Sequence, residues 1–124
     1  MDMNYEVIVI GDFNDFDGEV LDKNNNKPTS KVLEILKGHF GTQANKYELF
    51  SVAENLEQSE RYSDWYDKNN DCQSTDGEFS QIDHILVSEY LLKNIQNVSM
   101  FHSYKEYCGT YYSDHYPLIV DFLL

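Results

Sequence analysis

The chain has 124 residues, of which 41% are hydrophobic and 15% aromatic, and its formal net charge is −13 at pH 7. This length fits one domain, and a chain of this size buries roughly two thirds of its unfolded surface. The charge excludes attraction to phosphate backbones by bulk electrostatics, so a phosphorylated substrate would have to be bound through cations.

The start of the chain is polar, and no long apolar run follows it. We therefore predict neither a secretory leader nor a membrane span, and a soluble, cytoplasmic protein if the chain is complete. An upstream signal peptide would instead allow secretion. In that case Cys72 and Cys108 could form a disulfide and Asn97, in an N-x-S sequon, could carry a glycan; free thiols are the equal alternative.

In chain order, the first half of the sequence predicts a strand at residues 7–10, an acidic loop at 12–28, a helix at 29–37 and a second strand at 47–53. The second half predicts a polar loop with one helical turn at residues 57–81, a strand at 82–87 and a helix at 88–95. A strand at 98–102, a loop at 104–114 and a last strand at 117–123 follow. Trp65, in the polar loop, is predicted to be a core residue.

Residues 10–19, IGDFNDFDGE, place four acids and an Asn at the end of the first strand. An EF-hand calcium loop needs oxygen ligands at positions 1, 3 and 5, Gly at 6 and Glu at 12. With Gly18 at position 6, Phe13 falls at position 1 and Asn24 at position 12. With Asp12 at position 1, Asp17 takes the place of the Gly. A calcium-binding module is therefore disfavoured.

Two later segments, SQIDHILV at 80–87 and SDHYPLIV at 113–120, also join an acid to an apolar strand. If the first strand runs antiparallel to the other two, all three acidic ends meet at one edge of the sheet. Strand alternation puts Asp83 on one face and His84 on the other, so only one of them can point into a common site.

Taken singly, these polar residues have ordinary structural explanations. Asp12 and Asn14 can cap a turn, Asp114 can be a turn residue, and His84 is predicted to be structural. The remaining acids of the first loop are predicted to be solvated: Asp15, Asp17, Glu19 and Asp22. The functional hypothesis rests on the combination.

Three motifs occur in this order: GDFND, then S-x-I-D-H with I-L-V-S, then S-D-H-x-P before a final strand. Their combination resembles the endonuclease/exonuclease/phosphatase superfamily, whose fold is deoxyribonuclease I-like. The resemblance runs from about Tyr5 to Leu124. It implies an α+β fold, an α/β sandwich with a mixed or antiparallel sheet and flanking helices, in which residues 1–124 form one partial domain.

The resemblance also implies roles for individual residues. His115 matches the catalytic histidine that contacts the scissile phosphate, and Asp83 matches the carboxylate bonded to the other ring nitrogen. Asp12 and Asn14 match the pair that orients the attacking water and the phosphate, and Asp114 matches an acid at the metal end of the site. The implied reaction is hydrolysis of a phosphate ester, in a nucleic acid or a phospholipid head group, with Mg²⁺ or else Mn²⁺ or Ca²⁺.

Physical chemistry supports this set of residue types. The transition state of phosphoryl transfer carries spread negative charge, so catalysis is mostly positioning and electrostatics. A carboxylate fixes the tautomer of a histidine and stabilises its protonated form. Clustered acids need a cation beside them to offset their repulsion.

The chain departs from the family pattern in length, because a complete family domain is about twice as long. The Asn, the metal-binding Glu and the second histidine of the N-terminal half have no counterparts here, so the chain matches the C-terminal half. We expect it to be weakly active or inactive alone, and to be completed by an N-terminal half. A face including some of Val7, Val9, Ile85, Val87, Ile119 and Val120 would then be open to such a partner or to self-association. The alternative is a non-enzymatic remnant that binds a partner through this face.

Overall fold

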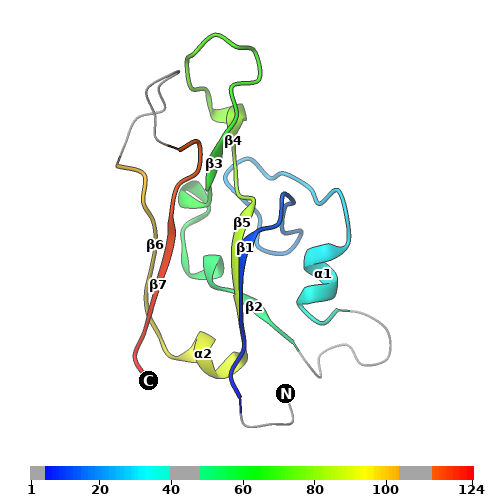
Figure 1. The fold of residues 1–124 in the computed structure, drawn as a ribbon, viewed down its shortest axis with the longest axis vertical. Helices are drawn as coiled ribbons and strands as arrows, with labels where there is room; N and C mark the ends of the chain where they lie inside the picture. Colours follow the sequence, from blue (N-terminus) through cyan, green and yellow to red (C-terminus); the bar gives the residue numbers. More distant parts are fainter. Residues whose placement is uncertain (1–4, 40–47, 104–112) are drawn as a thin grey trace.

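The computed structural model describes residues 5–39, 48–103 and 113–124. The strands in these ranges are β1 (Ile8–Asp12), β2 (Phe50–Ser51), β3 (Asp64–Trp65), β4 (Phe79–Ser80), β5 (Asp83–Val87), β6 (Ile95–Met100) and β7 (Leu118–Phe122). The helices are α1 (Val32–Leu36) and α2 (Glu89–Lys93), with 3₁₀ turns η2 (Val52–Asn55), η3 (Gln58–Glu60) and η4 (Asp76–Glu78). Helices and antiparallel strands occur together, which is compatible with the α+β class (Figure 1).

The central sheet has the order β1-β5-β2, and both of its pairings are antiparallel. The register places Asp12 opposite Asp83 and Ile10 opposite Ile85. The prediction that all three acidic motifs meet at one edge of this sheet is therefore confirmed for the first two and wrong for the third, whose strand lies in another sheet. β7 does not extend this sheet: it pairs with β6 in a separate antiparallel pair.

The helix α1 covers one face of the central sheet, through a cluster that contains Leu33, Leu49 and Leu86. It begins later than the predicted start at residue 29 or 30. The reason is Asp15, whose carboxylate accepts the backbone N–H groups of Thr29 and Ser30 and holds both residues outside the helix. Gly38, with a φ of 87°, follows the helix in the left-handed conformation that glycine adopts without strain.

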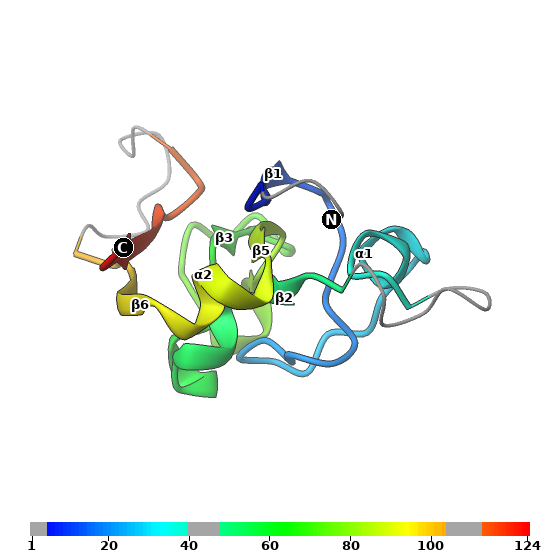
Figure 2. The same cartoon turned by 90° about the horizontal axis from the view of Figure 1, so that it is seen from below.

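The strands β6 and β7 lie on the opposite side of the central sheet from α1 (Figure 2). The core on this side joins Val52, Ile85, Val87 and Leu91 to partly buried residues of β6 and β7, among them Val98 and Val120. The sheet is thus sandwiched between a helix and a β-hairpin-like pair, and each face of β5 serves a different core.

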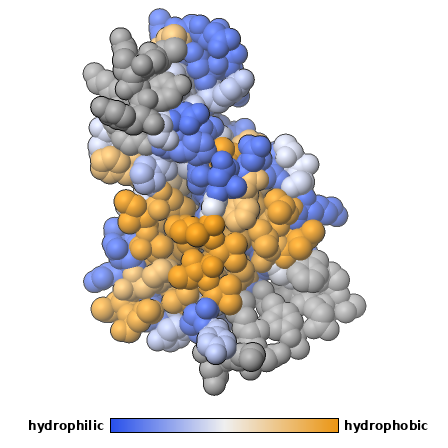
Figure 3. All heavy atoms as spheres, in the orientation of Figure 1, coloured by the Kyte–Doolittle hydropathy of each residue, from blue (hydrophilic) through white to orange (hydrophobic). Residues whose placement is uncertain are grey.

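An apolar surface remains open on the face shown in Figure 3. Its residues differ from those expected, because Ile85 and Val87 are buried and Val7 and Val9 pack against Leu86. The exposed apolar side chains of β1 are instead those of Ile8 (50% exposed) and Ile10 (68%), which point away from the α1 core. The expectation for Ile119 is confirmed, since it is 42% exposed.

The segment predicted as one loop at 57–81 contains more structure than expected. β3 pairs with β4, and Trp65 packs with Phe79 and Tyr116 in a separate aromatic cluster. Trp65 is therefore a core residue, as predicted. The predicted strand at 47–53 is reduced to β2, because Ser51 caps the 3₁₀ turn η2 that follows it.

Cys108 and most of the predicted 104–114 loop lie outside the described residues. The prediction that Cys72 and Cys108 could form a disulfide therefore also lies outside them. Within the described ranges, no helix combines the length and the apolar character needed to cross a bilayer.

Candidate active site

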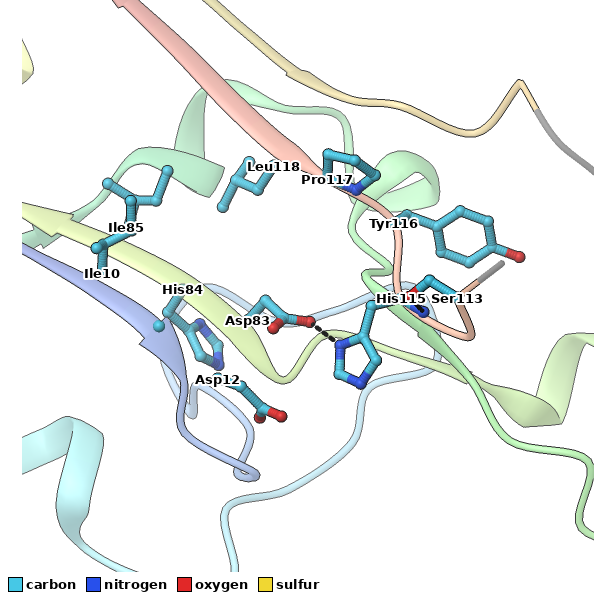
Figure 4. A pocket seen from close by; sticks show the side chains of 11 residues that line it. Ile10, Asp12, Asp83, His84, Ile85, Ser113, His115, Tyr116, Pro117 and Leu118 are labelled. Atoms are coloured by element: carbon cyan, nitrogen blue, oxygen red, sulfur yellow. Dashed lines mark hydrogen bonds and ion pairs between the residues drawn. The ribbon is translucent and has the colours of Figure 1, made fainter. Parts of the chain in front are cut away.

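A histidine–carboxylate pair lies at the centre of the site. Nδ1 of His115 is 2.7 Å from Oδ2 of Asp83, as Figure 4 shows. An ionised carboxylate only accepts hydrogen bonds, so Nδ1–H donates and Nε2 carries the lone pair in the neutral ring. Asp83 is the first residue of β5, and His115 comes from the segment that leads into β7.

Backbone hydrogen bonds dock the His115 segment onto β3. Trp65 donates its N–H to the carbonyl of Asp114, and Tyr116 donates to the carbonyl of Ser63. Asp64 and His115 form an isolated antiparallel bridge between these bonds. The segment that contains His115 docks against β3 and does not pair with β1 or β5. This docking brings the third motif close to the first two.

Asp12 lies beside Asp83, because the two residues face each other across the β1–β5 register. Oδ1 of Asp12 accepts the backbone N–H of Asn14 at 2.8 Å, and Asn14 has a φ of 49°. This is the turn-capping arrangement that the isolated motif suggested. Asn14 lines a neighbouring cavity of about 280 Å³ together with Asp64 and Lys68.

Two further carboxylates face the other ring nitrogen of the histidine. Nε2 of His115 is 3.7 Å from Oδ1 of Asp64 and 3.8 Å from Oδ1 of Asp114. Asp114 was expected at this place from the sequence. Asp64 was not, although it is the more buried of the two.

The electrostatics of the site are strongly coupled. Burial and the charges of Asp114, Asp83 and Asp12 together raise the pKa of Asp64 to about 6, against the attraction of His115, which lowers it. Burial would lower the pKa of His115, but the hydrogen bond and charge of Asp83 and the charges of Asp64 and Asp114 raise it above its ordinary value. Perturbed groups gathered in an opening are typical of functional sites.

The opening is a cavity of about 350 Å³ between β1, β5 and the segment before β7. Asp12, Asp83 and His115 line one end, and Ile10, Ile85 and Leu118 line the other, as Figure 4 shows. The polar groups therefore stand at the edge of the exposed apolar surface.

The donor atoms fit a divalent cation. Asp12, Asp83 and His115 form one group whose ligand atoms lie within 4.8 Å of one another, and Asp64, Asp114 and His115 form a second. Carboxylate oxygens suit Mg²⁺, Mn²⁺ and Ca²⁺, and an imidazole nitrogen suits transition ions.

His84, the next residue of β5, also borders the cavity but bonds elsewhere. It is buried, its Nε2–H donates to the carbonyl of Asp15, and burial lowers its pKa. Among the described residues its Nδ1 has no hydrogen-bond partner. The predictions that His84 is structural and that it points away from Asp83 are both confirmed.

The loop between β3 and β4 holds another acidic group, Asp67, Asp71 and Glu78. The spacing of Asp67, Asn69, Asp71 and Glu78 matches positions 1, 3, 5 and 12 of a calcium loop, which the sequence reasoning tested only at Asp12 and Gly18. Each acid already has a partner: Asp67 accepts from the Cys72 N–H, Asp71 from the Gln73 N–H, and Glu78 from Trp65 Nε1. These bonds hold the shape of the loop.

Comparison with known proteins adds no relative: no protein-family model matches the chain, and no curated protein matches it significantly.

Proposed function

We propose that this chain carries part of the active site of a metal-dependent phosphoesterase, in a deoxyribonuclease I-like domain of the endonuclease/exonuclease/phosphatase superfamily. The observation that supports this most is the pair of His115 and Asp83 at 2.7 Å with Asp12, Asp64 and Asp114 around it. Three separated sequence motifs meet there, and the resemblance rests on the same three motifs.

In this proposal the residues act mainly by positioning. Asp83 holds the His115 ring so that Nε2 is presented to the reacting phosphate, and it stabilises the protonated ring. Asp12 and Asn14 orient the attacking water and the phosphate. Asp114 helps to hold Mg²⁺, Mn²⁺ or Ca²⁺, which when bound offsets the charge of the phosphoryl group.

The proposal includes a second half of the domain. The family's metal-binding Glu and second histidine have no matches among these residues, and the open apolar face at Ile8 and Ile10 is the surface on which a further sheet could pack. We therefore expect weak activity from the 124-residue chain alone. The net charge of −13 disfavours tight nucleic-acid binding by this half but does not choose between nucleic acid and phospholipid head group as substrate.

Hydrolysis of an activated phosphodiester tests the proposal. The 124-residue chain at tens of micromolar is incubated with bis(p-nitrophenyl) phosphate and millimolar Mn²⁺ or Mg²⁺. We expect slow, cation-dependent release of nitrophenolate that falls at least tenfold in His115→Ala. His39→Gln is the control, because that ring lies beside Glu19 and Glu48 at the end of α1. Turnover that His115→Ala does not change contradicts the assignment, and rapid turnover contradicts the need for a second half.

The exposed apolar face favours one alternative function, a non-enzymatic fragment that binds a partner. The exposed side chains of Ile8 and Ile10 on β1 are the apolar surface to which such a partner could bind. Self-association in sedimentation velocity, together with an absence of any cation-dependent turnover, would support this alternative over the enzyme.

A further inference from the structure

The outer face of the β6–β7 pair takes no part in the proposed catalysis. Val98 of β6 and Val120 of β7 pack against the core. Side chains alternate along a strand, so the neighbours of these two residues point away from the core. We call this surface the outer β6–β7 face, and its residues are Asn97 and Ser99 of β6, Ile119 and Asp121 of β7, and Leu123, which follows β7.

Asn97 lies between two exposed apolar side chains of this face. The register places Asn97 opposite Asp121, which makes Ile119 and Leu123 its diagonal neighbours across the pair. Ile119 is 42% exposed and Leu123 is 68% exposed. Diagonal neighbours in an antiparallel pair are about 7–8 Å apart, so a bulky group attached to Asn97 would reach over both side chains.

The amide of Asn97 is accessible. The residue is exposed, and β6 is bulged between Ile95 and Asn97. Among the described residues, no hydrogen bond uses the side-chain amide of Asn97. Its nitrogen is therefore available to a modifying enzyme without loss of a contact that holds the fold.

Asn97, Val98 and Ser99 form the N-x-S signal for N-glycosylation, with a middle residue other than proline. No other N-x-S or N-x-T triplet occurs in the 124 residues. Such triplets also arise by chance. Burial of Asn97 would have made this one irrelevant, but it lies exposed in the middle of an apolar surface.

A second feature points to the compartment in which N-glycans are added. Cys72 is disulfide-bonded, and its partner lies outside the described residues. Disulfides persist in the oxidising secretory compartment and are rare in the cytosol. Cys72 lies in the loop between β3 and β4, far in sequence from Asn97, so the two features point to the secretory compartment independently.

We propose that Asn97 is the acceptor of an N-linked oligosaccharide that covers the outer β6–β7 face. The donor is an oligosaccharide carried on a polyprenyl diphosphate. A bond forms between Nδ2 of Asn97 and C1 of the first sugar, and the bond between C1 and the diphosphate oxygen breaks. The diphosphate leaves with the electron pair, and Nδ2 gives up one proton.

The glycan would shield apolar surface without blocking the candidate active site. Glycans are bulky and well hydrated, so this one would keep Ile119 and Leu123 from contacts with other molecules. Leu118, the residue before Ile119, lines the candidate active-site cavity. Because Ile119 points the opposite way, the glycan lies on the far side of β7 from the cavity. The proposal therefore does not depend on any hydrolysis.

Expression of the chain behind a cleavable signal peptide in cultured eukaryotic cells tests the site. Material from the cells and from the medium is analysed, so that poor secretion does not hide the modification. We expect an intact mass that exceeds the polypeptide mass by one N-glycan, which peptide-N-glycosidase F removes. Asn97→Gln and Ser99→Ala should lack the glycan, whereas Ser99→Thr, the matched control, should retain it. An unmodified wild-type chain, or a glycan that persists in Asn97→Gln, would overturn the assignment.

Sedimentation velocity tests the covering role. We expect the enzymatically deglycosylated chain to self-associate about tenfold more strongly than the glycosylated chain, because its outer β6–β7 face is open. Deglycosylation converts Asn97 to Asp, and the added charge opposes this result. Ile119→Ser should reverse the increase, whereas the exposed Ile8 and Ile10 are common to both forms. Equal self-association of the two forms would overturn the covering role.

Discussion

Two groups of acids lie on opposite sides of β5, and their environments differ. On the α1 side, Asp15 accepts five hydrogen bonds from Phe16, Thr29 and Ser30, and Asp17 pairs with the buried Lys37 at 3.0 Å. On the His115 side, no hydrogen bond between residues that the structure describes reaches the carboxylate of Asp64, and four carboxylates surround one histidine. The α1-side acids are matched by N–H and O–H donors and a lysine, whereas the acids around His115 share one histidine.

The difference teaches how to distinguish structural from functional acids in this chain. Asp15, Asp17 and Asp22 were predicted to be solvated, and that prediction is wrong: all three are buried and fix the loop that follows β1. Their donors come from nearby loop residues, and for Asp22 also from Gln81 at 3.1 Å. Around His115, Asp12 accepts the N–H of Asn14 and Asp83 accepts from the ring of His115, but among the described residues no hydrogen bond reaches the carboxylate of Asp64. Perturbed carboxylates of this kind are typical of functional sites.

The largest expected effect comes from removing the lysine partner of a buried acid on the α1 side. Lys37→Met should lower the free energy of unfolding by about 3–5 kcal/mol, because it leaves the buried charge of Asp17 without its partner. Urea denaturation monitored by Trp65 fluorescence measures this. Lys93→Met, which removes an exposed i,i+4 pair with Glu89, should cost at most about 0.5 kcal/mol. Equal costs for the two variants would mean that the α1 side is not compensated as described.

The second effect is a loss of stability in acid that belongs to Asp15. Burial opposes its charge, but the hydrogen bonds of Ser30, Thr29 and Phe16 lower its pKa to about 2 from 3.8. Its contribution is therefore complete above pH 3.8 and is lost as the pH falls through 2, a total of about 2 kcal/mol. Between pH 5 and pH 3 wild type should lose about 1 kcal/mol more than Asp15→Asn does. Parallel pH profiles of the two proteins would contradict this assignment.

The smallest expected effect concerns the pKa of His115 in the candidate site. In EDTA, the His115 ring should titrate above the ordinary pKa of histidine, because the hydrogen bond and charge of Asp83 outweigh burial. The resulting stabilisation is present below pH 6.5 and disappears as the pH rises through the pKa of the folded protein. Asp83→Asn should move the pKa of His115 down, as NMR titration of the ring would show, and should destabilise the protein more at pH 6 than at pH 9. An unchanged His115 titration in Asp83→Asn would mean that the 2.7 Å pair does not control the ring.

Local patterns predicted most of the regular elements. The strand near residues 7–10, the helix before Gly38, the strand that begins with Asp83 and the last strand all appear within a few residues of their predicted positions. These segments have clear apolar periodicity and clear stop signals. The prediction failed where long-range hydrogen bonds decide the outcome, as at the start of α1, where Asp15 captures Thr29 and Ser30.

The candidate site was predicted only in part, again because local motifs can be read from the sequence and long-range contacts cannot. Asp12, Asp83, Asp114 and His115 were identified because each lies in a motif, and the register between β1 and β5 puts the first two together. Asp64 could not be identified, since its segment reads as a polar loop. Its burial depends on packing of Trp65 with Phe79 and Tyr116, which are distant in sequence.

By itself, the amino-acid sequence determined the strands and the placement of Asp83 and His84 on opposite faces of one strand, because hydrophobic periodicity and strand alternation are local properties. Only the tertiary structure decided which acids are compensated. The charge state and solvation of a carboxylate depend on donors and on like charges within a few ångströms, and these come from segments that the chain brings together only when it folds. Asp15 and Asp64 show this most clearly: both are buried acids in polar segments, and only the fold surrounds one with N–H and O–H groups and the other with carboxylates.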